Sequence, residues 1–451
     1  MNLLLAVLLI PLAAGALLAL VGSRPAAPAV NLAASAATFA AACALTLQVI
    51  VGGPMQMLGG QFFLDPFNVF LVTLTSFVGM TTAMFSRPYM RIEQDRGRLT
   101  PARLRLYHSM YQLFMFTMLL ALTTNNLGLL WVAMEAATLS TVLLYFAAER
   151  VLGSEGMNAL LWTHLDAVKT RLEPGIIGIA FVFLLVGYGT KVGLVPLHSW
   201  LPDAHAEGPT PVSAVLSGLL LNVALYAVMR GKVLVEGSVH AAWPGQMLMG
   251  FGLLSVVFGA LLIWRQKDVK RMFAYSSIEH MGIITFAFGM GGPVANFAAL
   301  LHMTGHALTK SAIFYTTGHA AQKAHSQRID AINGLREVSP PLGWGLMMGV
   351  LAIVGMPPFS VFASEFLILT TAMQQQPWAT PILLAGLGVA FGALFLRTQG
   401  MVFGSSTLQK LPHSPDLLPV FLHLALVLLL GLWIPPFLVG WWHLAAEMIG
   451  A

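Results

Sequence analysis

Long apolar runs, separated by short polar segments, occupy most of this sequence. Most runs hold about 20 residues, the length of an α-helix that crosses a ~30 Å hydrocarbon core. They do not alternate apolar and polar residues, as the strands of a membrane barrel do. The pattern predicts an all-α polytopic membrane protein with about 13 spans. These spans cover residues 2–22, 28–51, 66–85, 106–124, 127–148, 175–197, 211–229, 243–264, 272–290, 294–318, 341–375, 378–400 and 416–440.

Three segments between the runs have a character of their own. Residues 53–65 combine Gly and Pro with short β-prone pieces and predict a small hairpin outside the bilayer. Residues 86–106 form a basic loop, and residues 149–174 are too polar to cross, which favours a surface helix. The first run lacks a basic leader and continues into further spans, so we interpret it as a span rather than a cleaved signal.

Composition supports the membrane class and narrows the chemistry. Hydrophobic residues make up 57% of the chain and charged residues 9%, against about 25% charged residues in soluble domains. The single cysteine, Cys43, excludes internal disulfides and argues against a cysteine-ligated iron–sulfur or zinc centre. The net charge of +5 comes from bases in loops, where they orient a membrane protein. We therefore expect no cofactor and no nucleic-acid partner.

A charged residue interrupts the apolar run at 175–197. Lys191 lies in its last third, and a charge within a bilayer costs ~2.5–3.5 kcal/mol on insertion scales. The simpler alternative is a lysine that reaches the membrane surface from the end of its helix. A proline-broken polar segment follows, and it carries His198, Asp203, His205 and Glu207.

The second half of the chain contains a matching interruption. The run at 341–375 is too long for one straight span and breaks at Pro357–Pro358, with Glu365 just beyond. Paired interruptions in the two halves of a membrane chain are typical of a binding or transport site.

Histidines mark the run at 294–318. His302, His306 and Lys310 follow each other at intervals of four residues and share one helix face. His280, which follows Glu279, belongs to the preceding run. A structural hydrogen-bond network is the alternative explanation for these histidines. His302 and His306 also have the spacing of two metal ligands, but the glutamate of an HExxH site is missing, so we expect no metal.

Acids and bases inside apolar helices form a candidate proton path, because histidines titrate near neutral pH and can bridge the lysines. We expect Glu135 and Lys191 to face each other, since paired opposite charges are better tolerated in a bundle. The polar segment after Lys191 is a candidate proton entry. The predicted path comprises Glu135, Lys191, His280, His302, His306, Lys310 and Glu365.

Five stretches carry a resemblance to a known family. They are WVAMEAATLST, GYGTKVGLVPLHSWLPDAHAEGPTPVSAVLSG, RQKDVKRMFAYSSIEHMG, HMTGHALTKSAIFYTTGHAAQKA and GMPPFSVFASEFLIL. The chain resembles the antiporter-like membrane subunits of respiratory complex I, multi-subunit cation/proton antiporters and energy-converting hydrogenases, nearest to the component F branch of hydrogenase 4. The resemblance implies 14 helices with two inverted five-helix repeats, each with a broken helix. We expect one integral membrane domain over 1–451, with a translocating core at 126–400 between N-terminal spans at 1–125 and a C-terminal span at 401–451.

Two departures from the family pattern stand out. Asn222 occupies a position where the family often has a lysine or histidine, and asparagine does not titrate. After Leu144 about one span is missing from the first repeat. With that span restored, the loops divide the lysines and arginines sixteen to five between the two sides; without it the division is twelve to nine. Only the first division obeys the positive-inside rule well.

The resemblance implies a function as well as a fold. We expect a multi-pass subunit of a bacterial or archaeal cytoplasmic membrane that moves protons, or Na⁺, across the lipid bilayer. It would be driven by electron transfer in partner subunits of a hydrogenase or complex I-like assembly, and would hold no catalytic centre of its own. The alternatives are a membrane subunit of an inorganic-carbon uptake system and an inactive scaffold.

Overall fold

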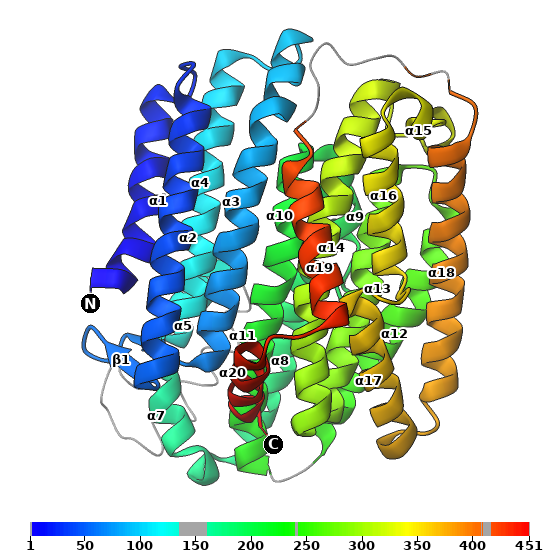
Figure 1. Cartoon of the computed structure of the whole chain (residues 1–451). Coiled ribbons are helices and arrows are strands. Elements are labelled where there is room, and N and C mark those ends of the chain that lie inside the picture. Colours follow the sequence, from blue (N-terminus) through cyan, green and yellow to red (C-terminus); the bar gives the residue numbers. More distant parts are fainter. Residues whose placement is uncertain (1, 135–159, 240–241, 407, 409–415, 451) are drawn as a thin grey trace.

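The computed structural model describes residues 2–134, 160–239, 242–406, 408 and 416–450. In this part of the chain most of the long helices run side by side along one common direction (Figure 1). The N-terminal helices form one side of the bundle and the C-terminal helices the other, with the helices around Lys191 between them. The first group contains α1 (Asn2–Val21), α2 (Ala27–Gly52), α3 (Pro66–Asp95), α4 (Pro101–Thr123) and α5 (Leu127–Met134).

The central group is made of shorter pieces, because prolines and glycines interrupt its helices. It contains α7 (Trp162–Ala167), α8 (Pro174–Val192), α9 (Trp200–Glu207), α10 (Thr210–Val215), a π-helical turn (Leu216–Leu220) and α11 (Leu221–Val239). The C-terminal group contains α12 (Trp243–Arg265), α13 (Val269–Met290), α14 (Gly292–Ala324), α15 (Leu335–Val338), α16 (Pro340–Ile353), α17 (Ser360–Gln375), α18 (Thr380–Phe403), α19 (Leu418–Leu432) and α20 (Pro436–Glu447).

Several local predictions are confirmed. The hairpin at 53–65 consists of β1 (Met55–Met57) and β2 (Phe62–Leu64), which pair antiparallel with Gln56 opposite Phe63. The long run at 341–375 is broken, since α16 ends before Pro357–Pro358 and α17 begins after it. A short helix, α7, lies within the polar segment at 149–174.

Other boundaries differ from the prediction. The basic segment at 86–106 is largely helical, because α3 continues to Asp95 before a short turn leads into α4. The predicted span at 416–440 is a pair of helices, α19 and α20, bent by 83° where Pro435 and Pro436 interrupt the helix. Of the predicted span at 127–148, only the part up to Met134 lies within the described residues.

Seven helices of the described residues are long and apolar enough to cross a membrane, or eight if the bent pair is one span. The sequence predicts about 13. The difference arises partly because α13 and α14, with 22 and 33 residues, carry buried lysine, glutamate and histidine side chains that lower their apolar character. These two helices lie inside the bundle, where protein rather than lipid surrounds the polar groups.

A buried ion pair ties the N-terminal group to the central group. Arg230 Nη2 of α11 lies 2.6 Å from Asp65 Oδ2, and both side chains are almost fully buried. Asp65 also caps α3 by accepting hydrogen bonds from the backbone N–H groups of Phe67 and Asn68. The Arg230 guanidinium lies 4.4 Å from the ring centroid of Trp162, which adds a cation–π contact. One arginine thus connects the start of α3, the start of α7 and the middle of α11.

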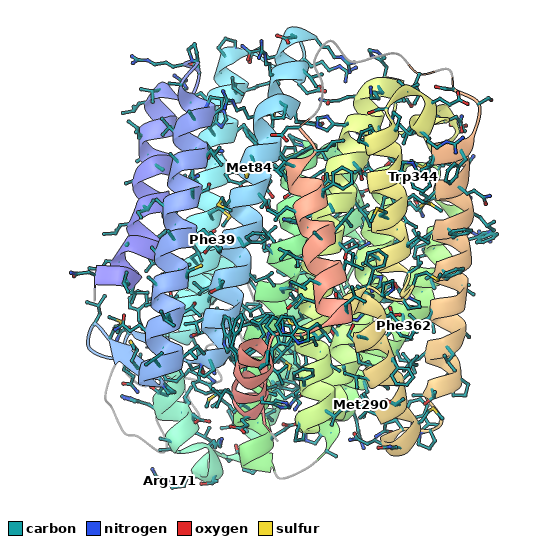
Figure 2. All side chains as sticks on the ribbon, in the orientation of Figure 1. Phe39, Met84, Arg171, Met290, Trp344 and Phe362 are labelled. Carbon is teal, nitrogen blue, oxygen red and sulfur yellow. The ribbon has the colours of Figure 1, made fainter. Side chains whose placement is uncertain are left out.

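The outer surface of the bundle is apolar. Large hydrophobic side chains such as Trp344 and Phe362 lie exposed on it (Figure 2). Such a surface is stable against acyl chains rather than water. The α3–α4 turn, the α12–α13 turn and the segment after α14, all of which carry bases, lie together at one end of the bundle. The α3–α4 turn is at the top of Figure 1, whereas the β1–β2 hairpin and α7 are toward the bottom. By the positive-inside rule we expect the first end to face the cytoplasm.

Candidate functional site

Close packing of two glycine-rich helices positions the first part of the site. Helices α12 and α13 approach so closely that a Cβ on Gly282 would lie 2.6 Å from the carbonyl oxygen of Gly252. Gly259 lies directly against the backbone of Glu279 in the same way. Small residues allow this approach. Glu279 and His280 are both at least 98% buried as a result.

Hydrogen bonds connect α13 to α14 and α17. His280 Nδ1 lies 3.0 Å from His302 Nε2, and His302 Nδ1 lies 2.9 Å from the hydroxyl of Ser364. On its other side, His280 Nε2 is 3.3 Å from Glu279 Oε2. Each ring nitrogen can be donor or acceptor, depending on which tautomer is present. The result is a line of polar groups across three helices, from Glu279 through the two histidines to Ser364.

The broken helix brings an acid to the same place. The break leaves Gly355 at φ +71°, and a Cβ there would clash with the carboxylate of Glu365. A small cavity of about 10 Å³, close to the space one water needs, lies between Glu279, His280 and Glu365. The sequence predicts that Glu365 follows a helix break, and in the structure it lies in the second turn of α17, after that break. The structure adds that the break lets the backbone approach the carboxylate.

Three side chains of this cluster also have the arrangement of cation ligands. His280, His302 and Glu365 each place one donor atom within 4.8 Å of the others, and all three are buried. The pair suggested by sequence spacing, His302 with His306, is not the pair brought together. His306 has no hydrogen-bond partner on either ring nitrogen among the described residues, and its ring centroid lies 5.7 Å from that of His280.

Lys310 extends the line away from the broken helix. Its side chain is fully buried, and Nζ donates a hydrogen bond of 2.9 Å to the carbonyl oxygen of Phe273. Nζ also lies 5.7 Å from the centroid of the Phe273 ring, and Lys310 interacts electrostatically with Glu279. The Lys310 side chain is therefore held across the α13–α14 contact by one backbone carbonyl and one aromatic ring.

The polar segment after Lys191 divides between interior and exterior. His205 is fully buried and stacks on Phe314 of α14, with ring centroids 4.8 Å apart. Asp203 is largely exposed and forms an ion pair of 2.6 Å with Arg271. Glu207 is exposed, and His198 is half-buried. Of these four predicted residues, only His205 reaches the buried line on α14.

The candidate residues of the first half lie at the end of α8 and on α11. Lys191 is half-buried in the last turn of α8, which ends at Gly193 in the left-handed conformation. Its predicted partner Glu135 lies outside the described residues. Asn222 is buried on α11 and donates a hydrogen bond of 3.1 Å to the carbonyl oxygen of Gly218, within the π-helical turn. Such turns are frequent at functional sites.

Sequence reasoning missed the serines of the interior. Ser364 contacts His302, and Ser217 of the π-helical turn lies 2.7 Å from Ser277 of α13, oxygen to oxygen. Serine is common in apolar helices, where it bonds to its own backbone. Nothing in the spacing marks these residues, because their importance depends on which helices meet.

The fold and the site together define a class of antiporter-like membrane subunits, and comparison with known proteins agrees. The chain belongs to the NADH:quinone oxidoreductase/Mrp antiporter transmembrane family, whose model matches residues 112–392. This confirms the resemblance found in the five sequence stretches. A similar protein is the Hydrogenase-4 component F homolog of Methylacidiphilum infernorum, 48% identical over 419 residues, 85% of this chain and 88% of that protein. Component B of hydrogenase-4 from Escherichia coli is 26% identical over 357 residues, 71% of this chain and 52% of that protein.

Solved structures share the fold. A chain of the membrane-bound sulfane sulfur reductase, an archaeal respiratory membrane complex, superposes with a TM-score of 0.88 at 21% identity and covers 100% of this chain and 98% of that one. A chain of respiratory complex I from Thermus thermophilus gives 0.82 at 22% identity, with coverage of 99% and 98%.

The comparison also bears on the expected missing span. The alignment with the Methylacidiphilum protein has 419 positions but includes only 85% of the 451 residues of this chain. Some residues of that protein within the aligned region therefore have no counterpart in this chain.

Proposed function

We propose that this chain carries protons across the cytoplasmic membrane as a subunit of a redox-driven complex of the hydrogenase or respiratory type. The observation that carries this proposal is the line of buried polar groups from Glu279, whose carboxylate lies 3.3 Å from His280, through the hydrogen-bonded His280 and His302 to Ser364. Membership of an antiporter-like family supports ion transfer in general. The buried histidines favour protons over Na⁺, because an imidazole passes a proton between its two nitrogens.

The proposed path enters from the cytoplasmic end at His205 and continues to Lys310. Lys310 then exchanges its proton with Glu279, its electrostatic partner on α13. His280 and His302 pass the proton onward toward Glu365, whose carboxylate lines the same small cavity as His280 and Glu279. His306 lies beside the line and provides a second imidazole close to His280.

The driving force is proposed to come from other subunits. The described residues hold no cluster of cysteines that could bind an iron–sulfur centre, and Cys43 lies exposed on α2. The relatives named hydrogenase-4 components, and the respiratory complexes that share the fold, make a redox-driven assembly the natural setting. We further propose the family arrangement of 14 helices in two inverted repeats, with one span lost after α5.

Reconstitution of the purified complex into liposomes tests the proposal. Addition of the redox substrate of the partner subunits is expected to move protons, followed with a pH-sensitive dye, and a protonophore is expected to collapse the signal. His302→Asn removes the imidazole that contacts both His280 and Ser364 and is expected to reduce proton movement strongly. His443→Asn on α20 is the matched control, because His443 is exposed at the surface.

The same experiment separates the alternatives. Wild-type complex that oxidises its substrate without moving protons would indicate an inactive scaffold. Copurification with a zinc-bearing soluble subunit, in place of hydrogenase and iron–sulfur subunits, would indicate inorganic-carbon uptake. Equal proton movement in wild type and His302→Asn would contradict the proposed path.

A further inference from the structure

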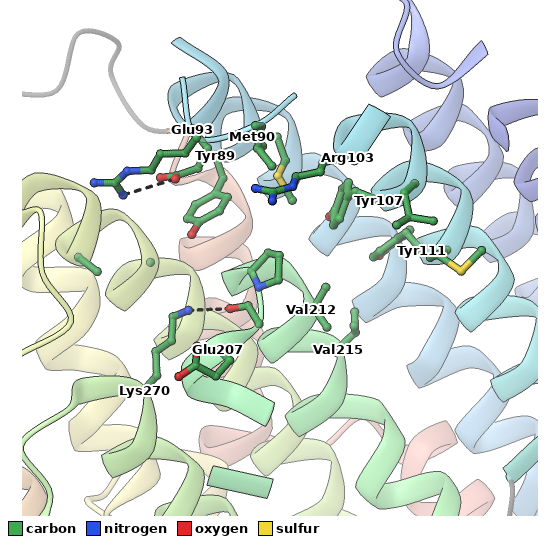
Figure 3. Close-up of a pocket in the computed structure, with 18 of the residues that line it drawn as sticks. Tyr89, Met90, Glu93, Arg103, Tyr107, Tyr111, Glu207, Val212, Val215 and Lys270 are labelled. Atoms are coloured by element: carbon green, nitrogen blue, oxygen red, sulfur yellow. Dashed lines mark hydrogen bonds and ion pairs between the residues drawn. The ribbon is translucent and has the colours of Figure 1, made fainter. Parts of the chain in front are cut away.

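A large pocket lies apart from the proposed proton path. It has a volume of about 1060 Å³ and opens between α3, α4, α10 and the end of α14, at the end of the molecule with the basic loops (Figure 3). Pockets for drug-sized ligands hold about 300–1,000 Å³. Of the predicted site residues, only Glu207 lines it.

One wall of the pocket is an apolar stripe on α4. Leu106, Met110 and Phe114 follow each other at intervals of four residues and so share one helix face. Leu106 is 59% exposed and Met110 is 48% exposed, so the described residues leave this face largely uncovered. Val212 and Val215 of α10 line the facing wall. These surfaces are suited to hydrocarbon.

Tyrosines complete the wall without offering free hydroxyl groups. The Tyr107 hydroxyl bonds to that of Ser86, and the Tyr111 hydroxyl donates to the carbonyl oxygen of Gly79. The Tyr89 hydroxyl accepts a hydrogen bond from Thr210. Because these groups are already bonded within the wall, the tyrosines contribute mainly their rings to the pocket.

Three basic residues, Arg98, Arg103 and Lys270, line the same pocket. The Arg103 guanidinium has no partner among the described residues. Arg98 contacts Glu93 at 3.5 Å through one of its nitrogens, which leaves its other donors available. Lys270 is buried beside the rim and uses one of its three donors on the carbonyl oxygen of Gly208, 2.8 Å away. Two acids, Glu93 and Glu207, line the pocket too, so its lining carries a net positive charge.

We infer that this pocket binds an anionic phospholipid of the cytoplasmic leaflet. The headgroup phosphate would lie against Arg98 and Arg103, near Lys270, and the acyl chains along the apolar stripe of α4. Charge complementarity favours this occupant, because cytoplasmic leaflets are rich in anionic lipids and basic pockets between membrane helices bind their headgroups. A purely apolar partner helix would not need a cluster of bases at one end of its groove.

Photolabelling tests the inference directly. The complex is reconstituted with phosphatidylglycerol that carries a diazirine in one acyl chain, irradiated, and digested for mass spectrometry. Labels are expected on α4 around Leu106 and Met110. The double variant Arg98→Gln/Arg103→Gln is expected to lose about fivefold in labelling per base removed. Arg105→Gln is the matched control, because Arg105 is exposed on the same helix but does not line the pocket.

A second variant separates lipid binding from folding. Leu106→Trp fills the apolar part of the pocket and leaves all bases in place, so it is expected to reduce labelling while the complex still assembles. Labelling of the wild type by a zwitterionic phosphatidylcholine probe to the same extent would overturn the inference. So would undiminished labelling in the double-arginine variant, or a crosslink from a photoreactive residue at position 106 to protein in place of lipid.

Discussion

The two broken helices of this protein stand in different surroundings. Around Glu365, three helices bring two histidines, two acids and a serine into contact in the fully buried interior. Around Lys191, the lysine is half-buried at the end of α8, and the neighbouring helix offers an amide, Asn222, in place of a titratable group. Burial without contact to water requires partners for polar groups. His280 and His302 find theirs in residues far apart in the sequence, whereas the ring nitrogens of His306 and one oxygen of Glu365 have none among the described residues.

This difference suggests a division of labour between the halves. The second half contains a hydrogen-bonded pair of histidines, His280 and His302, which we propose as part of the proton path. In the first half, a proton that reaches Lys191 must continue past Asn222, where water would have to carry it. We therefore expect the second half to dominate the measured proton movement, and the following changes test that expectation.

Lys310→Ala is expected to have the largest effect. It removes the buried lysine that interacts electrostatically with Glu279 and leaves His280 as the basic side chain beside that acid. Proton movement in liposomes should fall to the level of liposomes without the complex. Lys191→Ala should retain a measurable fraction. Equal loss in the two variants would contradict the division proposed here.

Arg230→Ala is expected to have a large effect on stability. Removal of one partner from a buried ion pair costs about 3–5 kcal/mol, because the other charge stays buried. Asp65 would be left in this state, at the point where α3 meets α11. Thermal unfolding of the purified protein in detergent measures the loss. The double change Asp65→Asn/Arg230→Met removes both charges and keeps a side chain that can cap α3, so it should be much less destabilising; an equally large loss in the double variant would argue against the charge as the cause.

His306→Ala is expected to have a moderate effect. His306 has no hydrogen-bond partner among the described residues, so its removal breaks no bond. We expect slower proton movement per assembled complex, with a melting temperature close to that of the wild type. A structural role would give the opposite result: a lower melting temperature with unchanged proton movement per complex.

Asn222→His is expected to have the smallest effect, a modest gain. It introduces a group that titrates near neutral pH on the helix after Lys191. Asn222→Leu, which is of similar size and does not titrate, is the control and should leave proton movement unchanged. Reduced proton movement in both variants would show that the hydrogen bond from the Asn222 side chain to the carbonyl oxygen of Gly218 is needed for the π-helical turn.

Those local features of the fold that depend on neighbouring residues within one segment were predictable from the sequence. The hairpin before Asp65 and the break at Pro357–Pro358 depend on Gly and Pro within a few residues, and both occur as predicted. The bend between α19 and α20 was not predicted, although Pro435 and Pro436 mark it. The apolar run around them predicts one span, because its hydrophobicity is nearly continuous.

The candidate site was only partly predictable, because its geometry depends on distant contacts. Regular spacing placed His302, His306 and Lys310 on one face, and all three are buried. Spacing did not indicate that His302 pairs with His280 rather than His306, since that depends on how α13 packs against α14. The roles of these residues in proton transfer remain predictions.

Helix α14 has one consequence for how such a protein can work. It runs for 33 residues without an internal proline, a length of about 50 Å at 1.5 Å per residue. His302 and Lys310 are therefore held about 12 Å apart along a rigid rod. Because α14 is a rigid helix, it keeps these two side chains at a fixed separation. Any gate on the proposed path therefore has to come from changes in side-chain rotamers, from water, or from movement of the interrupted helices beside α14.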